Sequence, residues 1–206
     1  MARSRSDPPD MEKQLPSGLI LASGSPARRE LLERAGYDFD VMPANVDEPS
    51  GEGFADARSL VQYTAWLKAA AVAPRVDHGV VLSADTVGWL HGRVIGKPAD
   101  AADARRILRL LSGTEHELWT GVCLWRRPDD LQLAWQEVSR VAMAPLSDTQ
   151  LDVYLSSRTW QGCSGAYAIQ ENDDPYVRVV RGSTSNVIGL PMETLEKTLG
   201  WLARPT

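Results

Sequence analysis

Short apolar runs alternate with amphipathic helical patterns along the chain after residue 17, and this alternation constrains the fold more than any other feature. The first unit shows the pattern clearly. Residues 18–22 form a short apolar run that suits a buried strand. Ser25 and Pro26 then open a helix, because serine is a favoured N-cap and proline a favoured first helical residue, and Gly36 ends it. A strand that leads directly into a helix is typical of α/β proteins.

The alternation continues to the end of the chain. Strands are predicted at 39–42, 80–84, 117–125, 131–143 and 175–180, with a hairpin turn at His91-Gly92, and helices at 55–73, 101–111, 147–155 and 192–202. Parallel and antiparallel strands are both expected, so the fold class is α/β on a mixed sheet flanked by helices. No linker or repeat divides residues 18–206, which we predict to be a single domain. Residues 1–17 lack the apolar core of a signal peptide and are predicted to be a disordered lead-in.

Composition excludes several classes of protein. The 22 basic and 27 acidic residues give a net charge of −5. A protein that coats nucleic acid is normally basic, so we expect no nucleic-acid partner. No stretch approaches the roughly 18 uninterrupted apolar residues of a membrane helix, so we expect no membrane partner either. Two cysteines, Cys123 and Cys163, make no disulfide framework, which favours a reducing cytoplasm.

The first candidate binding site is the junction between the strand 18–22 and the helix that follows it. A helix N-terminus presents unpaired backbone N–H groups and the positive end of the helix dipole, which together attract anions. Ser23 and Ser25 add hydroxyl donors, and Arg28 in the first turn can grip phosphate oxygens with its planar guanidinium. The segment predicts a phosphate site or, in the alternative, only a capped helix with solvent-facing arginines.

Four further residues carry charges that suit a phosphate ligand. Asp85 follows the predicted strand 80–84 and should lie at the edge of the sheet, where open α/β proteins bind ligands. There it could hold Mg²⁺ or orient water, and Glu48 in an acidic loop offers a second carboxylate. Lys97 follows a glycine that allows close approach of the backbone. Lys68 lies beside the buried stripe of its helix, so it either extends to the surface or points into a cleft.

These groups together form the set that hydrolysis of a nucleoside triphosphate requires. Cations and a metal ion neutralise the polyphosphate and stabilise the charge that develops as the bond breaks, while a carboxylate activates or positions the attacking water. The chain contains no Walker A sequence, so it is not a P-loop enzyme. Its three histidines are scattered, and we expect none of them to be catalytic or to bind a metal.

Several longer segments follow one another in a characteristic order: LILASGSPARRELLERAG, VDEP, ADTV, GRVIGKPADAADARRILRLLSGTEHELWTGVCL, GAYAIQ and SNVIGLPMETL. In order and spacing they resemble the Maf family of nucleotide pyrophosphatases, also called septum formation inhibitor proteins, from about Leu19 to Leu199. The resemblance implies an elongated Maf/ITPase-like fold with a cleft between two lobes. It also implies hydrolysis of a nucleoside triphosphate to the monophosphate and diphosphate, dependent on a divalent metal cation (Mg²⁺ or Mn²⁺). A house-cleaning role and a homodimer are implied as well.

The resemblance also assigns the residues that grip phosphate and metal. Ser23, Ser25 and Arg28 match the family's phosphate-binding first loop. Glu48 matches its acidic position on the metal side, and Asp85 matches its general base or metal ligand.

Four more positions match the catalytic cleft and the substrate side of the family. Lys68 and Lys97 match cleft lysines, and we expect them to be catalytic together with the aspartate. Gln170 matches the glutamine of the family's GAYxIQ motif, near the base and ribose, and we expect Thr86 to bind substrate as well.

Departures from the family pattern leave the substrate open. Ala27 stands where the commoner motif has an arginine, which looks like the branch acting on 7-methyl-GTP, and Cys163 stands where a lysine is usual. The segments 85–87 and 165–170 instead look like the branch that hydrolyses dTTP and UTP, and they should lie nearer the base. We therefore expect a dTTP/UTP pyrophosphatase. The alternatives are the same reaction on 7-methyl-GTP or another modified nucleotide, or a nucleotide-binding regulatory protein of septum formation without turnover.

Overall fold

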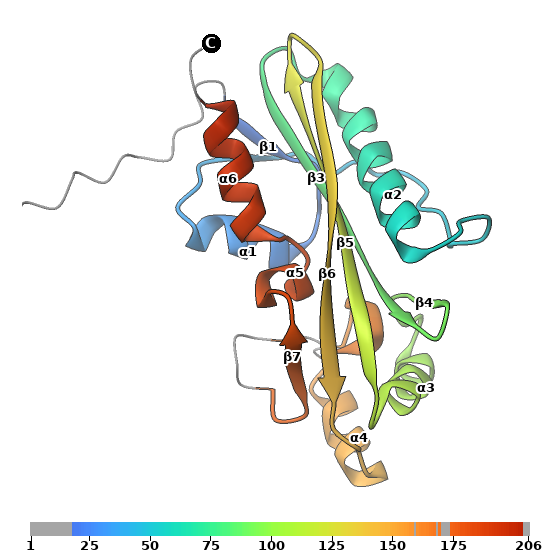
Figure 1. Ribbon diagram of the computed structural model, residues 1–206. Helices are drawn as coiled ribbons and strands as arrows, with labels where there is room; N and C mark the ends of the chain where they lie inside the picture. The colour runs from blue at the N-terminus through green and yellow to red at the C-terminus, as the bar shows by residue number, and fades with distance from the viewer. Residues whose placement is uncertain (1–17, 159, 168, 170–173, 204–206) are drawn as a thin grey trace, which may run out of the picture.

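A computed structural model describes residues 18–158, 160–167, 169 and 174–203. In this part of the chain one seven-stranded mixed sheet has the order β2-β1-β3-β5-β6-β7, with β4 paired to β3 (Figure 1). The elements in chain order are β1 (Leu19–Leu21), α1 (Pro26–Arg34), β2 (Asp40–Val41), α2 (Ala57–Val72), η1 (Ala73–Arg75), β3 (Gly79–Leu90), β4 (Arg93–Ile95), α3 (Ala101–Leu111), β5 (Glu115–Arg127), β6 (Leu131–Met143), α4 (Asp148–Ser156), η2 (Ser164–Ala166), β7 (Val177–Arg181), α5 (Thr184–Ile188) and α6 (Met192–Leu202).

The predicted α/β fold class is confirmed: the sheet is mixed and elongated, and helices flank it. The three long strands β3, β5 and β6 run through the whole molecule, with α1 and α6 on one side and α2 on the other (Figure 1). Separate clusters of buried side chains lie around α6 and around α3. Two further clusters of buried side chains include residues of α2.

Two local expectations were wrong. The strand predicted to stop at Ala84 continues to Leu90, because β5 pairs with it along its whole length from Gly79↔Arg127 to Trp89↔Glu117. Asp85 therefore lies in the middle of a strand and not at its end. The segment between the predicted strand 175–180 and the last helix, for which no helix was predicted, contains the short helix α5, which Ser183 caps by accepting a hydrogen bond from the Asn186 backbone N–H at 3.1 Å.

β3 has an unpaired stretch on the edge that faces away from β5. On that edge β1 pairs with β3 only as far as Leu21↔Leu82, and the Ala22 N–H then donates to the Leu82 carbonyl at 2.7 Å. β4 begins to pair only at Gly88↔Ile95. Residues 83–87 of β3 consequently have no neighbouring strand there, and the chain leaves β1 at this gap to enter α1. The gap is the structural basis of the site described below.

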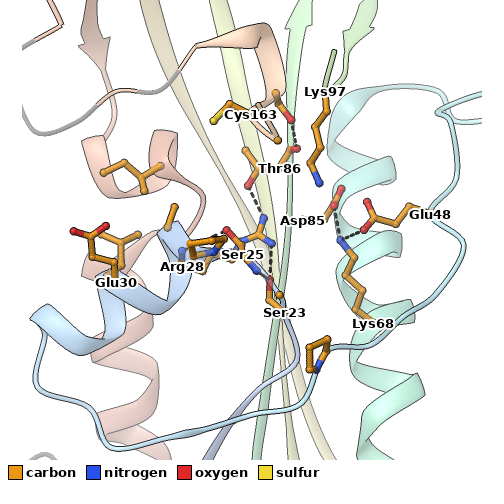
Figure 2. A pocket seen from close by; sticks show the side chains of 18 of the residues that line it. Ser23, Ser25, Arg28, Glu30, Glu48, Lys68, Asp85, Thr86, Lys97 and Cys163 are labelled. Atoms are coloured by element: carbon orange, nitrogen blue, oxygen red, sulfur yellow. Dashed lines mark hydrogen bonds and ion pairs between the residues drawn. The ribbon is translucent and has the colours of Figure 1, made fainter. Parts of the chain in front are cut away.

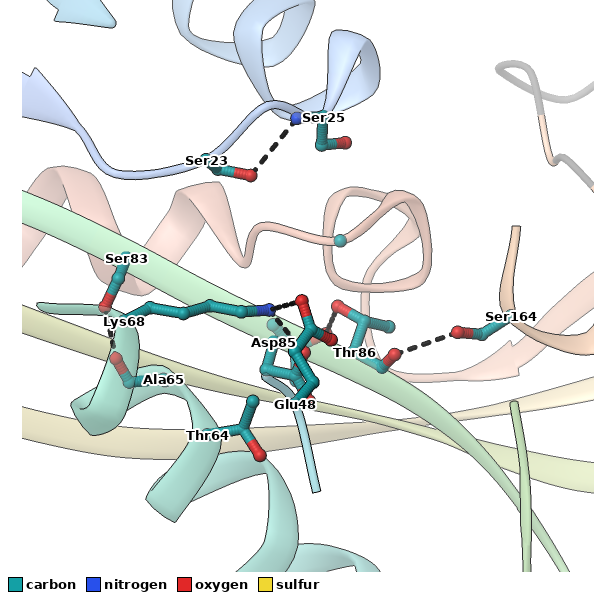
Figure 3. Close-up of polar contacts among 12 residues, drawn as sticks. Ser23, Ser25, Glu48, Thr64, Ala65, Lys68, Ser83, Asp85, Thr86 and Ser164 are labelled. Atoms are coloured by element: carbon teal, nitrogen blue, oxygen red, sulfur yellow. Dashed lines mark hydrogen bonds and ion pairs between the residues drawn. The ribbon is translucent and has the colours of Figure 1, made fainter. Parts of the chain in front are cut away.

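Alternation along β3 sends successive side chains to opposite faces of the sheet. Leu82 and Ala84 pack in the core that contains α6. Ser83 and Asp85 face α2 instead, and the Ser83 hydroxyl donates to the Ala65 carbonyl of that helix at 2.6 Å (Figure 3). The strand thus carries its polar side chains towards α2 along the stretch where its other edge is open.

Gly121 on β5 allows α2 to approach the sheet closely. It is the register partner of Asp85, and a Cβ atom added to it would lie 2.3 Å from the Val61 carbonyl oxygen of α2. No side chain could be accommodated there without moving the helix backbone. Since Lys68 lies two turns further along the same helix, this contact also sets the depth at which the lysine enters the site.

Among the described residues no helix is long and apolar enough to cross a membrane. The lead-in 1–17 lies outside the described residues, so the division into a lead-in and a single domain 18–206 stays a prediction.

We expect Gly121→Ala to lower the free energy of unfolding by about 3 kcal/mol, because overpacking against backbone cannot be relieved by a side-chain rotation. Urea denaturation at neutral pH measures the change. Gly200→Ala is the matched control: this glycine lies within α6, and a Cβ atom added to it would enter open space. That change should raise stability by up to about 1 kcal/mol through helix propensity. Equal stabilities of the two variants would contradict the close approach.

Candidate active site

A cavity of about 1010 Å³ opens at the gap beside β3 (Figure 2). Its walls come from parts of the chain that are distant in sequence: the first loop and α1, the acidic loop with α2, the β3 edge with Lys97, Leu118 of β5, the described residues of the segment 161–169, and residues 187–188. Eight of the nine residues predicted for the site are described, and all eight line this cavity: Ser23, Ser25, Arg28, Glu48, Lys68, Asp85, Thr86 and Lys97. Gln170 lies outside the described residues.

The first loop forms an anion-binding wall. The Ser25 side chain caps α1 by accepting a hydrogen bond from the Arg28 backbone N–H at 3.4 Å. The Ser23 hydroxyl oxygen accepts from the Ser25 N–H and from Arg28 Nη1, both at 3.2 Å. Both lone pairs of Ser23 are therefore used, and its proton is available to an oxygen in the cavity. A serine hydroxyl and a helix N-terminus that face the same space favour an anionic ligand.

Arg28 is buried and is held by neutral groups. Its Nε donates to the Gly189 carbonyl at 2.8 Å and its Nη2 to the Thr86 hydroxyl at 3.1 Å, in addition to the contact with Ser23 (Figure 2). Burial lowers the pKa of Arg28 from its ordinary value, while the negative charges of Asp85 and Glu48 act in the opposite direction. An arginine remains protonated in proteins. Its charge lies at the wall of the cavity without a directly bound carboxylate among the described residues.

Lys68 points into the cavity and joins two carboxylates. Its Nζ lies 2.8 Å from Asp85 Oδ1 and 2.8 Å from Glu48 Oε1 (Figure 3). Lys68 and Asp85 are only 7% and 6% exposed, so these charges have left bulk water and depend on one another. Of the two alternatives that the sequence left open for Lys68, the structure shows the one that points into the cleft.

The charge state of Glu48 follows from its surroundings. Partial burial raises its pKa, but the hydrogen bond and charge of Lys68 lower it, and the charges of Lys97 and Arg28 add to this, so that the net shift is downward. Glu48 is thus a carboxylate at neutral pH. The cavity wall then carries the carboxylates Glu30, Glu48 and Asp85 and the cations Arg28, Arg34, Lys68 and Lys97. Because Arg34 is paired with Glu30 at 2.6 Å, the remaining groups leave an excess of positive charge for a ligand.

Lys97 enters the cavity from the opposite side to Lys68. It follows β4 and directs its ammonium towards the space beside Asp85 (Figure 2). Cys163 lines the cavity near it: burial raises the pKa of this thiol, and the charge of Lys97 acts against that shift. A neutral thiol therefore forms this part of the cavity wall.

The donor set fits a divalent cation that is shared with a ligand. Among the described residues no cluster of three or more histidine, cysteine or acidic side chains forms a metal site. Glu48 and Asp85 each bind Lys68 through one oxygen, so that each has a second oxygen directed away from that contact. Mg²⁺ is commonly held by one or two carboxylates together with waters and substrate phosphates, so this pair is sufficient in number and in chemistry.

Several residues that support the site were not singled out from the sequence. The Ser164 hydroxyl donates to the Thr86 carbonyl at 2.9 Å, on the unpaired edge of β3 (Figure 3). The Gly189 carbonyl binds Arg28, and buried Thr120 and Asn186 lie behind Thr86. The motif SNVIGLP contains two of these residues, but its letters alone do not indicate that a backbone carbonyl within it binds an arginine.

The fold and site define a mixed α/β protein with an anion-binding, carboxylate-containing cleft. A family model described as Maf-like protein matches residues 18–202. A relative from Rhodopirellula baltica, named dTTP/UTP pyrophosphatase, is 42% identical over 196 residues, which cover 95% of this chain and 86% of the relative. A relative from Anaeromyxobacter dehalogenans with the same name is 47% identical over 176 residues, 84% of this chain and 88% of the relative.

The structure of the Staphylococcus aureus Ham1 protein is similar in fold, with a TM-score of 0.54, 14% identity, and coverage of 89% of this chain and 98% of that one. The resemblance found in the sequence is confirmed, and the chain belongs to the Maf family.

We expect Lys68→Met to raise the pKa of Glu48, because the hydrogen bond and charge that lower it are removed while the effect of burial remains. Carbon-detected NMR titration of the glutamate carboxyl groups measures this pKa, with Glu48→Gln to assign the resonance. Lys97→Met should raise the same pKa less, since Lys97 acts without a hydrogen bond. A Glu48 pKa unchanged in Lys68→Met would contradict the ion pair.

Proposed function

We propose that this chain is a nucleoside triphosphate pyrophosphatase that hydrolyses dTTP and UTP to the monophosphate and diphosphate. The observation that carries the proposal is the meeting of Asp85 with Arg28, Lys68 and Lys97 in one cavity beside a helix N-terminus. The names of the relatives from Rhodopirellula baltica and Anaeromyxobacter dehalogenans support the substrates.

In the proposed reaction a water molecule attacks the α-phosphorus while the bond to the β-phosphate bridging oxygen breaks and diphosphate leaves. Asp85 accepts the proton of the attacking water, because it lies at the open edge of β3 with Lys68 Nζ 2.8 Å from its Oδ1. Arg28, Lys97 and the Ser23 hydroxyl bind phosphate oxygens and stabilise the charge that develops on them. Ser25 and the N-terminus of α1 bind a terminal phosphate.

Glu48 and Asp85 would also hold a divalent cation, Mg²⁺ or Mn²⁺, which when bound neutralises phosphate charge and polarises the phosphoryl group. Lys68 keeps these two carboxylates side by side before substrate arrives, and it lowers the pKa of Glu48. The protein would thus offer a divalent cation a preformed pair of carboxylate ligands.

Two alternatives correspond to specific residues. Ala27 follows the pattern of the 7-methyl-GTP branch, so the same chemistry on that nucleotide is the second candidate. Cys163, a neutral thiol in the cavity wall, is the residue that favours a regulatory protein that binds nucleotide without turnover. The proposal further includes a cytoplasmic location, which suits two cysteines in the thiol form, and a homodimer, which light scattering tests.

Incubation with Mg²⁺ and a panel of dTTP, UTP, CTP, GTP and 7-methyl-GTP, followed by chromatography of the products, tests the reaction and its specificity together. We expect monophosphate and diphosphate from dTTP and UTP. Asp85→Asn should lower kcat by roughly 10²-fold or more, the scale for loss of a positioned acid–base group. Lys97→Ala should lower it similarly through lost charge stabilisation.

Three outcomes would contradict this assignment. Turnover of 7-methyl-GTP alone would assign the protein to the branch of the family that acts on 7-methyl-GTP. Binding of nucleotide without turnover would favour the regulatory protein. Wild-type kcat in Asp85→Asn would remove the proposed general base.

We expect Glu48→Gln to raise the concentration of Mg²⁺ needed for half-maximal activity by about tenfold, because one of two carboxylate ligands becomes a neutral amide. Asp47→Asn is the matched control: Asp47 is the adjacent acidic residue, exposed and not part of the cavity wall. Activity measured against Mg²⁺ concentration at saturating nucleotide separates the two. Equal shifts in both variants would show that only the general charge of the loop matters.

A further inference from the structure

A row of hydroxyl groups runs from Arg28 into the protein interior. Arg28 Nη2 donates to Thr86 Oγ1 at 3.1 Å, and Thr86 Oγ1 lies 2.9 Å from Thr120 Oγ1. The Thr120 hydroxyl in turn donates to the Asn186 carbonyl at 3.0 Å. The row crosses from α1 to β3, β5 and α5, which are the elements that meet behind the anion-binding wall.

The direction of every hydrogen bond in this row is fixed. A carbonyl oxygen only accepts, so the single proton of Thr120 goes to Asn186. Thr86 must therefore donate its own proton to Thr120. A lone pair of Thr86 is then left to face Arg28, which can only donate. The Thr86 proton is committed to the interior, in contrast to that of Ser23, which is free to meet a phosphate oxygen.

We propose that Thr120 is a positioning residue for Arg28: by accepting the Thr86 proton it keeps an acceptor directed at the guanidinium and so orients that group towards the substrate phosphates. Thr120 is fully buried and cannot touch a ligand itself. The inference rests on the proposed function for the identity of the ligand, but the orientation of Arg28 follows from the hydrogen bonds alone.

The Nε side of the Arg28 guanidinium is held by α5, the helix that also accepts the Thr120 proton. Arg28 Nε donates to the Gly189 carbonyl at the end of α5. A helix of five residues is not stable alone, so its position depends on tertiary anchors. Asn186 supplies them: its fully buried amide Nδ2 donates to the Leu118 carbonyl at 3.3 Å and to Ser139 Oγ at 2.9 Å. Asn186 therefore anchors two of the three acceptors of Arg28, the Gly189 carbonyl through α5 and the Thr86 hydroxyl through Thr120.

Thr120→Val keeps the shape of the side chain and removes the acceptor for the Thr86 proton. Thr86 then has either a buried proton without a partner or a proton directed at Arg28, and both weaken the support of the guanidinium. Thr120→Ser keeps the hydroxyl group and should therefore keep the support of the Arg28 guanidinium. We expect Thr120→Val to weaken binding of inorganic triphosphate in the presence of Mg²⁺ by about tenfold, and Thr120→Ser to bind nearly as the wild type does.

Isothermal titration with inorganic triphosphate tests this without any need for turnover. Steady-state kinetics with UTP provide the second readout, in which KM should rise about tenfold in Thr120→Val while kcat changes by less than about threefold. Arg28→Lys lacks the Nη2 group that binds Thr86. Adding Thr120→Val to Arg28→Lys should therefore weaken triphosphate binding little further, because residue 28 and residue 120 are then no longer coupled through Thr86. Thermal melting of each variant shows that it is folded.

The outcomes separate the two proposals. Equal triphosphate affinity in Thr120→Val and wild type would overturn the positioning role. Equally weak binding by Thr120→Ser and Thr120→Val, or full additivity with Arg28→Lys, would also overturn it and indicate a packing effect. If Thr120→Val does not fold, Thr86→Val against Thr86→Ser breaks the same row one step nearer to Arg28. A wild type that binds triphosphate but hydrolyses no nucleotide would refute the proposed function and leave these binding comparisons intact.

Discussion

The missing strand neighbour on one edge of β3 determines where every charged group of the site can lie. β1 ends opposite Leu82 and β4 begins opposite Gly88, so the intervening edge is open to the cavity although β5 pairs with the same residues on the other side. Because β3 is held so firmly by β5, the open stretch stays extended and presents side chains to both faces. Asp85 faces α2 and Thr86 faces α1, and both line one cavity. A continuous sheet would have separated them into two layers.

The buried charges of the cavity are arranged in two ways that have different consequences. Lys68 is bound between two carboxylates, so it holds them together and keeps Glu48 ionised. Among the described residues Arg28 is bound by a carbonyl and two hydroxyl groups, which orient it without neutralising it. An arginine paired to a carboxylate would have to exchange that partner for phosphate. One held by neutral acceptors keeps its charge for the ligand, although its burial lowers its pKa.

Much of this arrangement could be predicted from the sequence, and the limits have physical causes. The helix that starts at Ser25-Pro26 and the hairpin at His91-Gly92 are local features, so capping and turn preferences predict them. The length of β3 does not follow from local preferences, because it depends on pairing with β5, which is distant in the sequence. The direction of Lys68 stays open for a similar reason: it is decided by the missing side chain of Gly121 and the carboxylates across the cavity.

The roles of Thr120 and Asn186 could not be predicted from the sequence either, because they depend on hydrogen bonds between distant parts of the chain. A threonine within a strand and an asparagine in a small polar segment are each ordinary in a sequence, and neither indicates a contact with an arginine in a distant part of the chain. Their importance arises because a carbonyl at one end of the row and a guanidinium at the other allow only one direction of donation. Because Arg28 has no carboxylate partner among the described residues, the orientation that this row gives it decides how its charge meets a ligand in the cavity.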